Sequence, residues 1–272
     1  MQKDPPEAGP VEDRTGDMAF LDHVEELRWR IIKGLGGVAL GIAIAFFFRD
    51  FLIDTVILGP AKASFFIYEF LPIDAISLEL QSRRLPGQFF TYWGTLIIFG
   101  GIIGSPIFFY QMWGFIEPAL GKTEKWRTYG HTLFITFFFL LGVAFGYLIL
   151  VPFALQFFAQ FQISEMIHND FDINKYFSAL STWTLSCGII FQLPVITYFL
   201  SKFGLVTPEF LKEYRRHAIV LCFILAAALT PPDPVSQTLV AIPLLLLYQL
   251  SIWISKVGIR KRNKEMEEAF KG

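Results

Sequence analysis

The chain has 272 residues, of which 54% are hydrophobic and only 17% charged, and its formal net charge is −1. Soluble domains carry about 25% charged residues, and here the charges cluster between long apolar stretches, as expected of a chain whose solvent is lipid. The composition excludes an ordinary soluble domain, and the near-zero net charge gives no support for a nucleic-acid partner.

The first 17 residues are rich in Pro and acidic residues and lack the apolar core of a signal peptide. We therefore expect a disordered cytoplasmic tail at 1–17, a membrane domain at 18–257 and a charged cytoplasmic tail at 258–272. Residues 18–31 place Phe20, Val24, Leu27 and Ile31 at helical spacing. This pattern predicts an amphipathic helix ahead of the first span.

Six apolar stretches follow one another along the chain. They are residues 34–48, 85–116, 128–164, 176–201, 217–232 and 234–255. Stretches of this kind predict an all-α, polytopic membrane protein with six transmembrane helices. The fifth stretch is short and runs directly into a Pro-rich break at 230–234, which predicts a helical hairpin with the sixth.

Six spans place both termini on the same side of the membrane. The Lys and Arg residues near the span ends concentrate in the N-terminal region, in the loops after spans two and four, and after span six. The positive-inside rule then predicts that both termini are cytoplasmic, in the inner membrane. The loops at 49–88 and 153–175 are expected outside, and the mixed charge of the first is compatible with short helices.

The sequence contains no catalytic or metal-binding signature in a supporting context. Residues 121–123 resemble the end of a P-loop, but the preceding glycine and strand of that motif are missing. The histidines are scattered, at His23, His131, His168 and His217. Cys187 and Cys222 lie in apolar stretches, where we expect buried thiols and no disulfide. We predict a protein that is not an enzyme and has no cofactor and no metal.

The interiors of the six stretches hold no acidic residue and no Lys or Arg. An ion-coupled small-solute secondary transporter, the alternative function, would need an ionisable or substrate-binding group near mid-membrane. The most notable polar residue at depth is Gln192, beside Pro194. An interhelical hydrogen bond and a functional role are both open for it.

Carboxylates on the expected cytoplasmic face offer a binding chemistry. Glu26 lies in the amphipathic helix, and Glu117 and Glu124 follow span two. Such groups can accept paired hydrogen bonds from guanidinium groups, so a ligand with two adjacent arginines would match them. The alternative is a solvated charged surface with i,i+4 ion pairs such as Glu26–Arg30.

Several separated motifs resemble the TatC family, the largest subunit of the Sec-independent twin-arginine translocase. They are HVEELR at 23–28, SP at 105–106, YQMW at 110–113, FIEPAL at 115–120, FGY at 145–147 with Pro152, LTPPD at 229–233, SQT at 236–238 and AIP at 241–243. The resemblance runs from about residue 20 to 257, with the motifs in the family's order.

The resemblance implies a receptor that binds twin-arginine signal peptides of folded cargo. It also implies small single-span partner subunits of the TatA and TatB type, homo- and hetero-oligomers in the lipid bilayer, and transport driven by the proton-motive force. The implied signal-peptide residues are Glu26, Arg28, Phe115 and Glu124, and the implied partner-docking residues are Thr230, Pro231, Asp233 and Gln237.

Two further positions are notable by the same resemblance. Pro60 matches a functionally sensitive proline of the family in the first outer loop. At Gln192, many family members carry a glutamate; an amide can hydrogen-bond a partner helix but cannot exchange a proton as an acid does.

Overall fold

The computed structural model describes residues 14–71, 73–116, 125–164, 166, 169–230 and 234–271. The α-helices are α1 (Arg14–Phe47), α2 (Arg49–Phe51), α3 (Gly87–Ile116), α4 (Lys125–Phe145), α5 (Val151–Gln160), α6 (Ile173–Ile190), α7 (Leu193–Phe203), α8 (Pro208–Glu213), α9 (Arg215–Leu229) and α10 (Pro234–Lys271). The π-helices are η1 (Leu52–Ile57) and η5 (Gly146–Leu150), and the 3₁₀-helices are η2 (Gly59–Ala61) and η3 (Phe66–Glu69). Two short strands, β1 (Leu80–Gln81) and β2 (Phe171–Asp172), complete the described elements.

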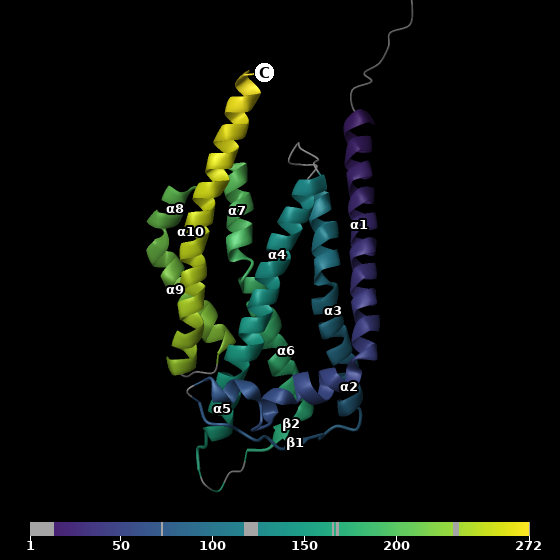
Figure 1. The fold of residues 1–272 in the computed structure, drawn as a ribbon, viewed down its shortest axis with the longest axis vertical. Coiled ribbons are helices and arrows are strands. Elements are labelled where there is room, and N and C mark those ends of the chain that lie inside the picture. Colours follow the sequence, from purple (N-terminus) through teal and green to yellow (C-terminus); the bar gives the residue numbers. More distant parts are fainter. Residues whose placement is uncertain are drawn as a thin grey trace, which may run out of the picture.

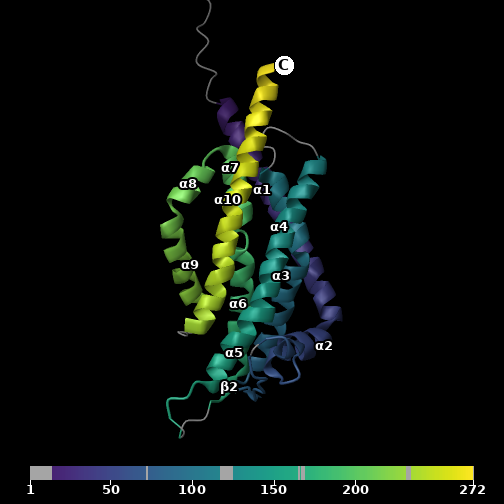
Figure 2. The ribbon, with the colours of Figure 1, turned by 60° about the vertical axis from the view of Figure 1, so that its left-hand side comes forward.

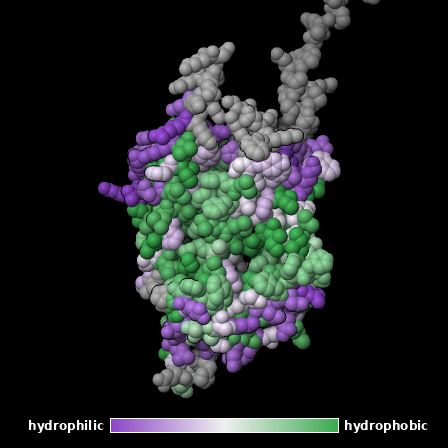
Figure 3. Space-filling view, viewed as in Figure 1, coloured by the Kyte–Doolittle hydropathy of each residue, from purple (hydrophilic) through white to green (hydrophobic). Residues whose placement is uncertain are grey.

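The long helices form one bundle along the long axis of the molecule (Figures 1 and 2). On one side of the bundle α1 lies beside α3. The middle is occupied by α4 and α6, and the other side is formed by α7 to α10. The start of α1 and the end of α10 lie at the same end of the bundle, which we call the terminal end; the opposite end, with α2 and the two strands, is the base. Figure 3 shows a hydrophobic band between two more hydrophilic ends, the surface expected of a membrane-spanning bundle.

Six segments of the described chain are long and apolar enough to cross a membrane. They are Val24–Phe47, Arg49–Glu69, Gly87–Ile116, Tyr129–Gln160, Ile173–Phe203 and Gln237–Arg260. Arg49–Glu69 was expected in an outer loop, and Figure 1 shows this segment crossing the base of the bundle. The predicted fifth span is α9, whose 15 residues give a length of about 22 Å; it runs alongside α10. The bundle thus contains the six predicted spans. The short helices α2, η1, η2 and η3 all lie within the predicted first outer loop, residues 49–88.

Glycines allow α1 and α3 to pack closely. A Cβ at Gly104 would lie 2.6 Å from the Gly37 carbonyl oxygen, and a Cβ at Gly41 would overlap the Gly100 carbonyl oxygen. Apolar side chains gain nothing by leaving lipid for each other, so close backbone contact is a main source of helix association in a membrane. The α1–α3 pair is therefore fixed along its length by residues without side chains.

Two predicted spans are interrupted where prolines occur. The third contains π-helix η5 immediately before Pro152, and the fourth ends α6 at Ile190 and begins α7 at Leu193, just before Pro194. Proline lacks the amide hydrogen that would continue the helical hydrogen bonds, so the ladder is broken or widened there. Pro106, by contrast, lies inside the unbroken helix α3.

The base is closed by contacts between the two predicted outer loops. β1 pairs in parallel with β2, and Arg83 Nη2 lies 2.9 Å from Asp170 Oδ2. Asp172 caps α6 by accepting hydrogen bonds from the backbone N–H groups of Asn174 and Lys175, at 3.0 and 3.2 Å. Desolvation opposes ionisation, but these bonds and one from the Arg83 N–H outweigh it and lower the pKa of the Asp172 carboxyl.

The boundaries expected for the two tails differ from the helix ends. α1 begins at Arg14, so residues 14–17, expected in the N-terminal tail, belong to its first turn; residues 1–13 lie outside the described chain. α10 continues through most of the expected C-terminal tail to Lys271. The Lys-, Arg- and Glu-rich stretch after 258 consists of good helix formers, which allows the helix to continue.

Candidate functional site

The seam between α1 and α3 at the terminal end holds the carboxylate singled out by the sequence. Glu26 Oε1 accepts a hydrogen bond from Arg30 Nε at 2.8 Å, and Arg30 Nη2 lies 2.7 Å from the same oxygen, which confirms the i,i+4 ion pair. The Glu26 side chain is 40% exposed and that of Arg30 is 26% exposed. The Arg30 guanidinium also lies against Gly114 of α3, where a Cβ would overlap Nη1.

The other predicted signal-peptide residues differ in what the structure describes of them. Arg28 is exposed, with its guanidinium carbon 5.8 Å from the centroid of the Trp29 ring. Phe115 directly follows Gly114 and is half-buried. Glu117 and Glu124 lie outside the described residues. The structure therefore brings Glu26 and the Phe115 segment to adjoining positions on two helices, while the pairing of Glu26 with Glu124 stays a prediction.

Of the predicted partner-docking residues, Thr230 and Gln237 lie at the base, where the end of α9 meets the start of α10. Thr230, which is 8% exposed, ends α9, and its Oγ1 donates to the Ala226 carbonyl at 2.8 Å. Gln237 Nε2 donates to the Phe223 carbonyl at 3.3 Å and so joins α10 to α9. Pro231 and Asp233 lie outside the described residues. The two predicted binding regions are thus at opposite ends of the bundle.

Gln192 lies at the break between α6 and α7. Its Nε2 donates to the Ile135 carbonyl of α4 at 3.3 Å, so the interhelical hydrogen bond, one of the two interpretations of this residue, is present. Gln192 also lines a cavity of about 570 Å³, whose wall is largely apolar but includes Ser105. Trp113 lines the same cavity, and its buried Nε1 has no hydrogen-bond partner within the described chain. A functional role of Gln192 therefore stays open beside its structural one.

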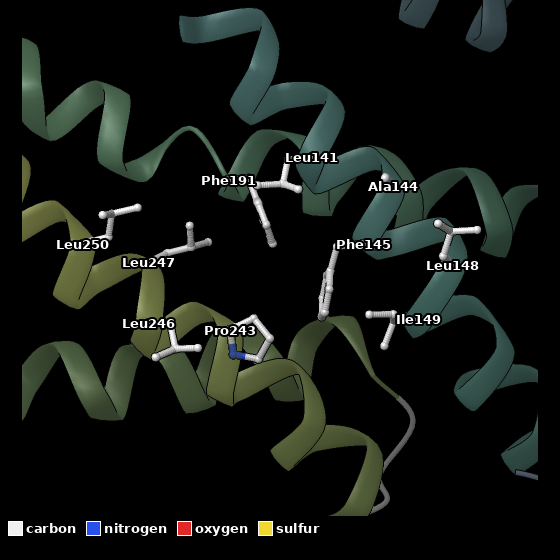
Figure 4. A pocket seen from close by; sticks show the side chains of 10 residues that line it. All are labelled: Leu141, Ala144, Phe145, Leu148, Ile149, Phe191, Pro243, Leu246, Leu247 and Leu250. Carbon is white, nitrogen blue, oxygen red and sulfur yellow. The ribbon is translucent and has the colours of Figure 1, made fainter. Parts of the chain in front are cut away.

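A second cavity, of about 440 Å³, lies between α10 and the α4–η5 segment. Figure 4 shows the side chains that line it, which are Leu141, Ala144, Phe145, Leu148, Ile149, Phe191, Pro243, Leu246, Leu247 and Leu250. All are apolar, so the cavity offers dispersion contacts and no acid–base or ligand chemistry.

Pro60 belongs to a network that sequence reasoning did not find. Its carbonyl accepts from the Tyr68 hydroxyl at 2.5 Å. Tyr147 and Tyr176 donate to the neighbouring carbonyls of Val56 and Ile57, each at 2.7 Å. Pro60 itself is fully buried. Tyr176 begins an apolar stretch, Tyr147 lies in the middle of another and Tyr68 lies in the first outer loop. The three tyrosines therefore share no sequence signal that could have identified the network.

The described residues contain no group of three or more His, Cys, Asp or Glu side chains that could hold a metal ion. Cys187 and Cys222 are both buried free thiols. The contacts at the sites described above are hydrogen bonds, an ion pair and apolar packing.

Comparison with known proteins decides the family. The model of the family described as "Sec-independent protein translocase protein (TatC)" matches residues 22–243. The chain belongs to the TatC family. The match includes α3, α4, α6, α7 and α9 and most of α1, and it ends within α10.

TatC proteins of known sequence match over nearly the whole chain. The TatC of Blattabacterium sp. subsp. Periplaneta americana is 39% identical over 266 residues, which are 93% of this chain and 100% of the relative. TatCy of Bacillus subtilis is 33% identical, covering 92% and 94%, and the Aquifex aeolicus TatC is 33% identical, covering 93% and 100%.

Two solved structures share the fold. A crystal structure titled "Twin Arginine Translocase Receptor- TatC" has a TM-score of 0.67 and 33% identity, covering 87% of this chain and 99% of that one. A second crystal structure, of the same receptor in DDM, has a TM-score of 0.69 and 32% identity, covering 86% of this chain and 99% of that one. The predicted family and the all-α six-span fold are confirmed. The chain is thus a multi-pass inner-membrane protein of a protein-translocase family, and the solute-transporter alternative receives no support.

Proposed function

We propose that this chain is the receptor subunit of a twin-arginine translocase, which binds the twin-arginine signal peptides of folded proteins at the terminal end of its bundle. The supporting observation is the Glu26 carboxylate, which lies in the α1–α3 seam and already binds a guanidinium group through two nitrogens. A carboxylate positioned to bind one arginine in this way can also bind an arginine from a ligand.

The terminal end faces the cytoplasm in this proposal. The Lys and Arg residues that flank the spans concentrate at this end in the sequence, as cytoplasmic segments of membrane proteins do. Signal peptides reach the translocase from the cytoplasm, so the receptor site must be on this side. Both termini are then cytoplasmic, and the base closed by β1 and β2 is outside.

Three further residues complete the proposed receptor site. Glu124 supplies a second carboxylate, because two arginines of a ligand call for two acceptors. Arg28 is exposed, two residues before Arg30 on α1, and is available to contact carbonyl groups of a bound peptide. Phe115 contributes an apolar surface for the peptide, beside the Gly114 contact with Arg30.

The partner subunits are proposed to dock elsewhere. The α9–α10 hairpin, with Thr230, Pro231, Asp233 and Gln237, is assigned to small single-span subunits of the TatA and TatB type. The apolar cavity beside α10 suits the apolar face of such a helix. Gln192 provides an amide for a partner, and Pro60 holds the base. Transport by the homo- and hetero-oligomer draws on the proton-motive force.

Charge reversal at the carboxylate tests the receptor assignment. Glu26→Lys should abolish crosslinking of a twin-arginine signal peptide to the full chain in membranes, because it replaces the acceptor by a repelling cation. Glu79→Lys makes the same charge change at an exposed position at the base and should leave crosslinking unchanged. Equal crosslinking of both variants and the unmodified chain would contradict the proposal.

A further inference from the structure

Only one of the two oxygens of the Glu26 carboxylate, Oε1, is bound by Arg30. Arg30 Nε donates to Oε1, and Arg30 Nη2 lies 2.7 Å from the same oxygen. Within the described chain Oε2 has no donor. An arginine ligand makes its strongest contact with a carboxylate through two parallel bonds, one to each oxygen. Such a bidentate contact needs Oε1 as well as Oε2, so an incoming guanidinium competes with Arg30.

The position of Arg30 depends on Gly114. A Cβ at position 114 would overlap Nη1 of Arg30 and lie 3.3 Å from its Cζ and 3.8 Å from its Nη2. These are the three nearest atoms to that Cβ, and all of them belong to the Arg30 side chain. The absence of a side chain at 114 is therefore what lets the guanidinium lie in the α1–α3 seam, beside Glu26.

The charges around Glu26 do not favour a cationic ligand while Arg30 is in place. Between residues 24 and 33, α1 carries the carboxylates Glu25 and Glu26 against the cations Arg28, Arg30 and Lys33. While Arg30 occupies Oε1, an arginine of the ligand cannot make its bidentate contact with Glu26. The cost of releasing Arg30 reduces the apparent affinity for any ligand that needs the same oxygen.

We propose that Arg30 is a resident guanidinium ligand of Glu26, which an arginine of the signal peptide must displace, and that Gly114 holds Arg30 in this position. The inference rests on the proposed receptor function of Glu26. It makes Arg30 a regulator of affinity: the free receptor keeps its carboxylate paired, and cargo exchanges one arginine for another.

Two variants disturb Arg30 in different ways. Arg30→Gln removes the competitor together with its charge. Gly114→Ala moves the guanidinium aside and leaves every charge in place. Gly36→Ala is the matched control, since a Cβ at Gly36 of α1 meets no atom within 4 Å. Glu26→Gln reports whether the carboxylate binds the peptide at all.

The measurement is the dissociation constant of a fluorescent twin-arginine signal peptide for the full chain in lipid nanodiscs. Arg30→Gln and Gly114→Ala should each lower it about fivefold, equivalent to about 1 kcal/mol, the size expected for a partly exposed ion pair. Gly36→Ala should leave it unchanged. Arg30→Lys, which keeps the charge and offers one nitrogen in place of two, should give an intermediate value.

The outcomes separate this inference from the proposed function. If the unmodified chain does not bind the peptide, or Glu26→Gln binds it equally well, the receptor assignment of Glu26 fails. If binding depends on Glu26 but Arg30→Gln leaves the affinity unchanged or weakens it, Arg30 is not a competitor and the inference is overturned. If Arg30→Gln raises the affinity for the peptide but neither Gly114→Ala nor Arg30→Lys does, the increase is due to the change in net charge. That result would also overturn the inference about Arg30.

Discussion

Removal of the Tyr176 hydroxyl most directly tests the contact that joins the 49–69 segment to α6 at the base. The hydroxyl donates to the Ile57 carbonyl at 2.7 Å across 119 positions of sequence, and the Tyr176 side chain is 4% exposed. Ile57 ends π-helix η1, and the chain turns at once into η2, which contains Pro60. Because a helix end leaves carbonyls without partners and proline has no amide hydrogen, this carbonyl needs a side-chain donor.

Tyr176→Phe removes the donor and keeps the ring, so its cost is that of a buried carbonyl without a partner. That cost is about 1–3 kcal/mol. The loss acts on the contact between the 49–69 segment and α6, so it should appear as local opening of the base more than as unfolding of the bundle. A cost of this size raises the open population by about 5- to 150-fold.

Limited proteolysis at Lys62, an exposed residue just after η2, measures this opening. When opening and closing are fast relative to cleavage, the cleavage rate follows the open population. We therefore expect Tyr176→Phe to be cut about 5- to 150-fold faster at Lys62 than the unmodified chain. Tyr129→Phe, at an exposed tyrosine of α4, is the control and should change nothing. Equal cleavage rates in the two variants would refute the assignment of this hydrogen bond as a brace of the base.

Three other predictions follow from packing, charge and hydrogen bonding. Gly41→Ala should lower the melting temperature in detergent, since overpacking costs about 1–3 kcal/mol, whereas Gly36→Ala, in open space, should not. The pKa of Asp172 is lowered in the folded chain, so its cap contributes above the unfolded value of about 3.9 and is lost as the pH falls through the lower folded value. The protection of the first α6 amides against hydrogen exchange, relative to the intrinsic rate at each pH, should therefore fall below about pH 4. Asp172→Asn should remove this pH dependence. Ser201 Oγ donates to Ser255 Oγ at 2.7 Å between α7 and α10; alanine at either position should cost about 0.6 kcal/mol, and additive losses in the double variant would exclude a direct bond.

The sequence by itself determined that this protein is embedded in a lipid bilayer, and it determined the position of most of its spans along the chain. Apolar stretches free of charge are a local property, because each residue meets lipid or water according to its own side chain. The same holds for the pair Glu26–Arg30, since residues four apart on a helix are always neighbours. The separated motifs were likewise sufficient to identify the TatC family.

Tertiary structure alone decided how the remaining segments lie. Arg49–Glu69 satisfies the length and hydropathy of a span, yet it crosses the base (Figure 1) because its buried face packs against η5, α5 and α6. The contact of Arg30 with Gly114 joins positions 84 residues apart. No sequence pattern within either helix predicts this contact. Contacts between distant segments depend on which helices become neighbours, and hydropathy along one chain does not contain that choice.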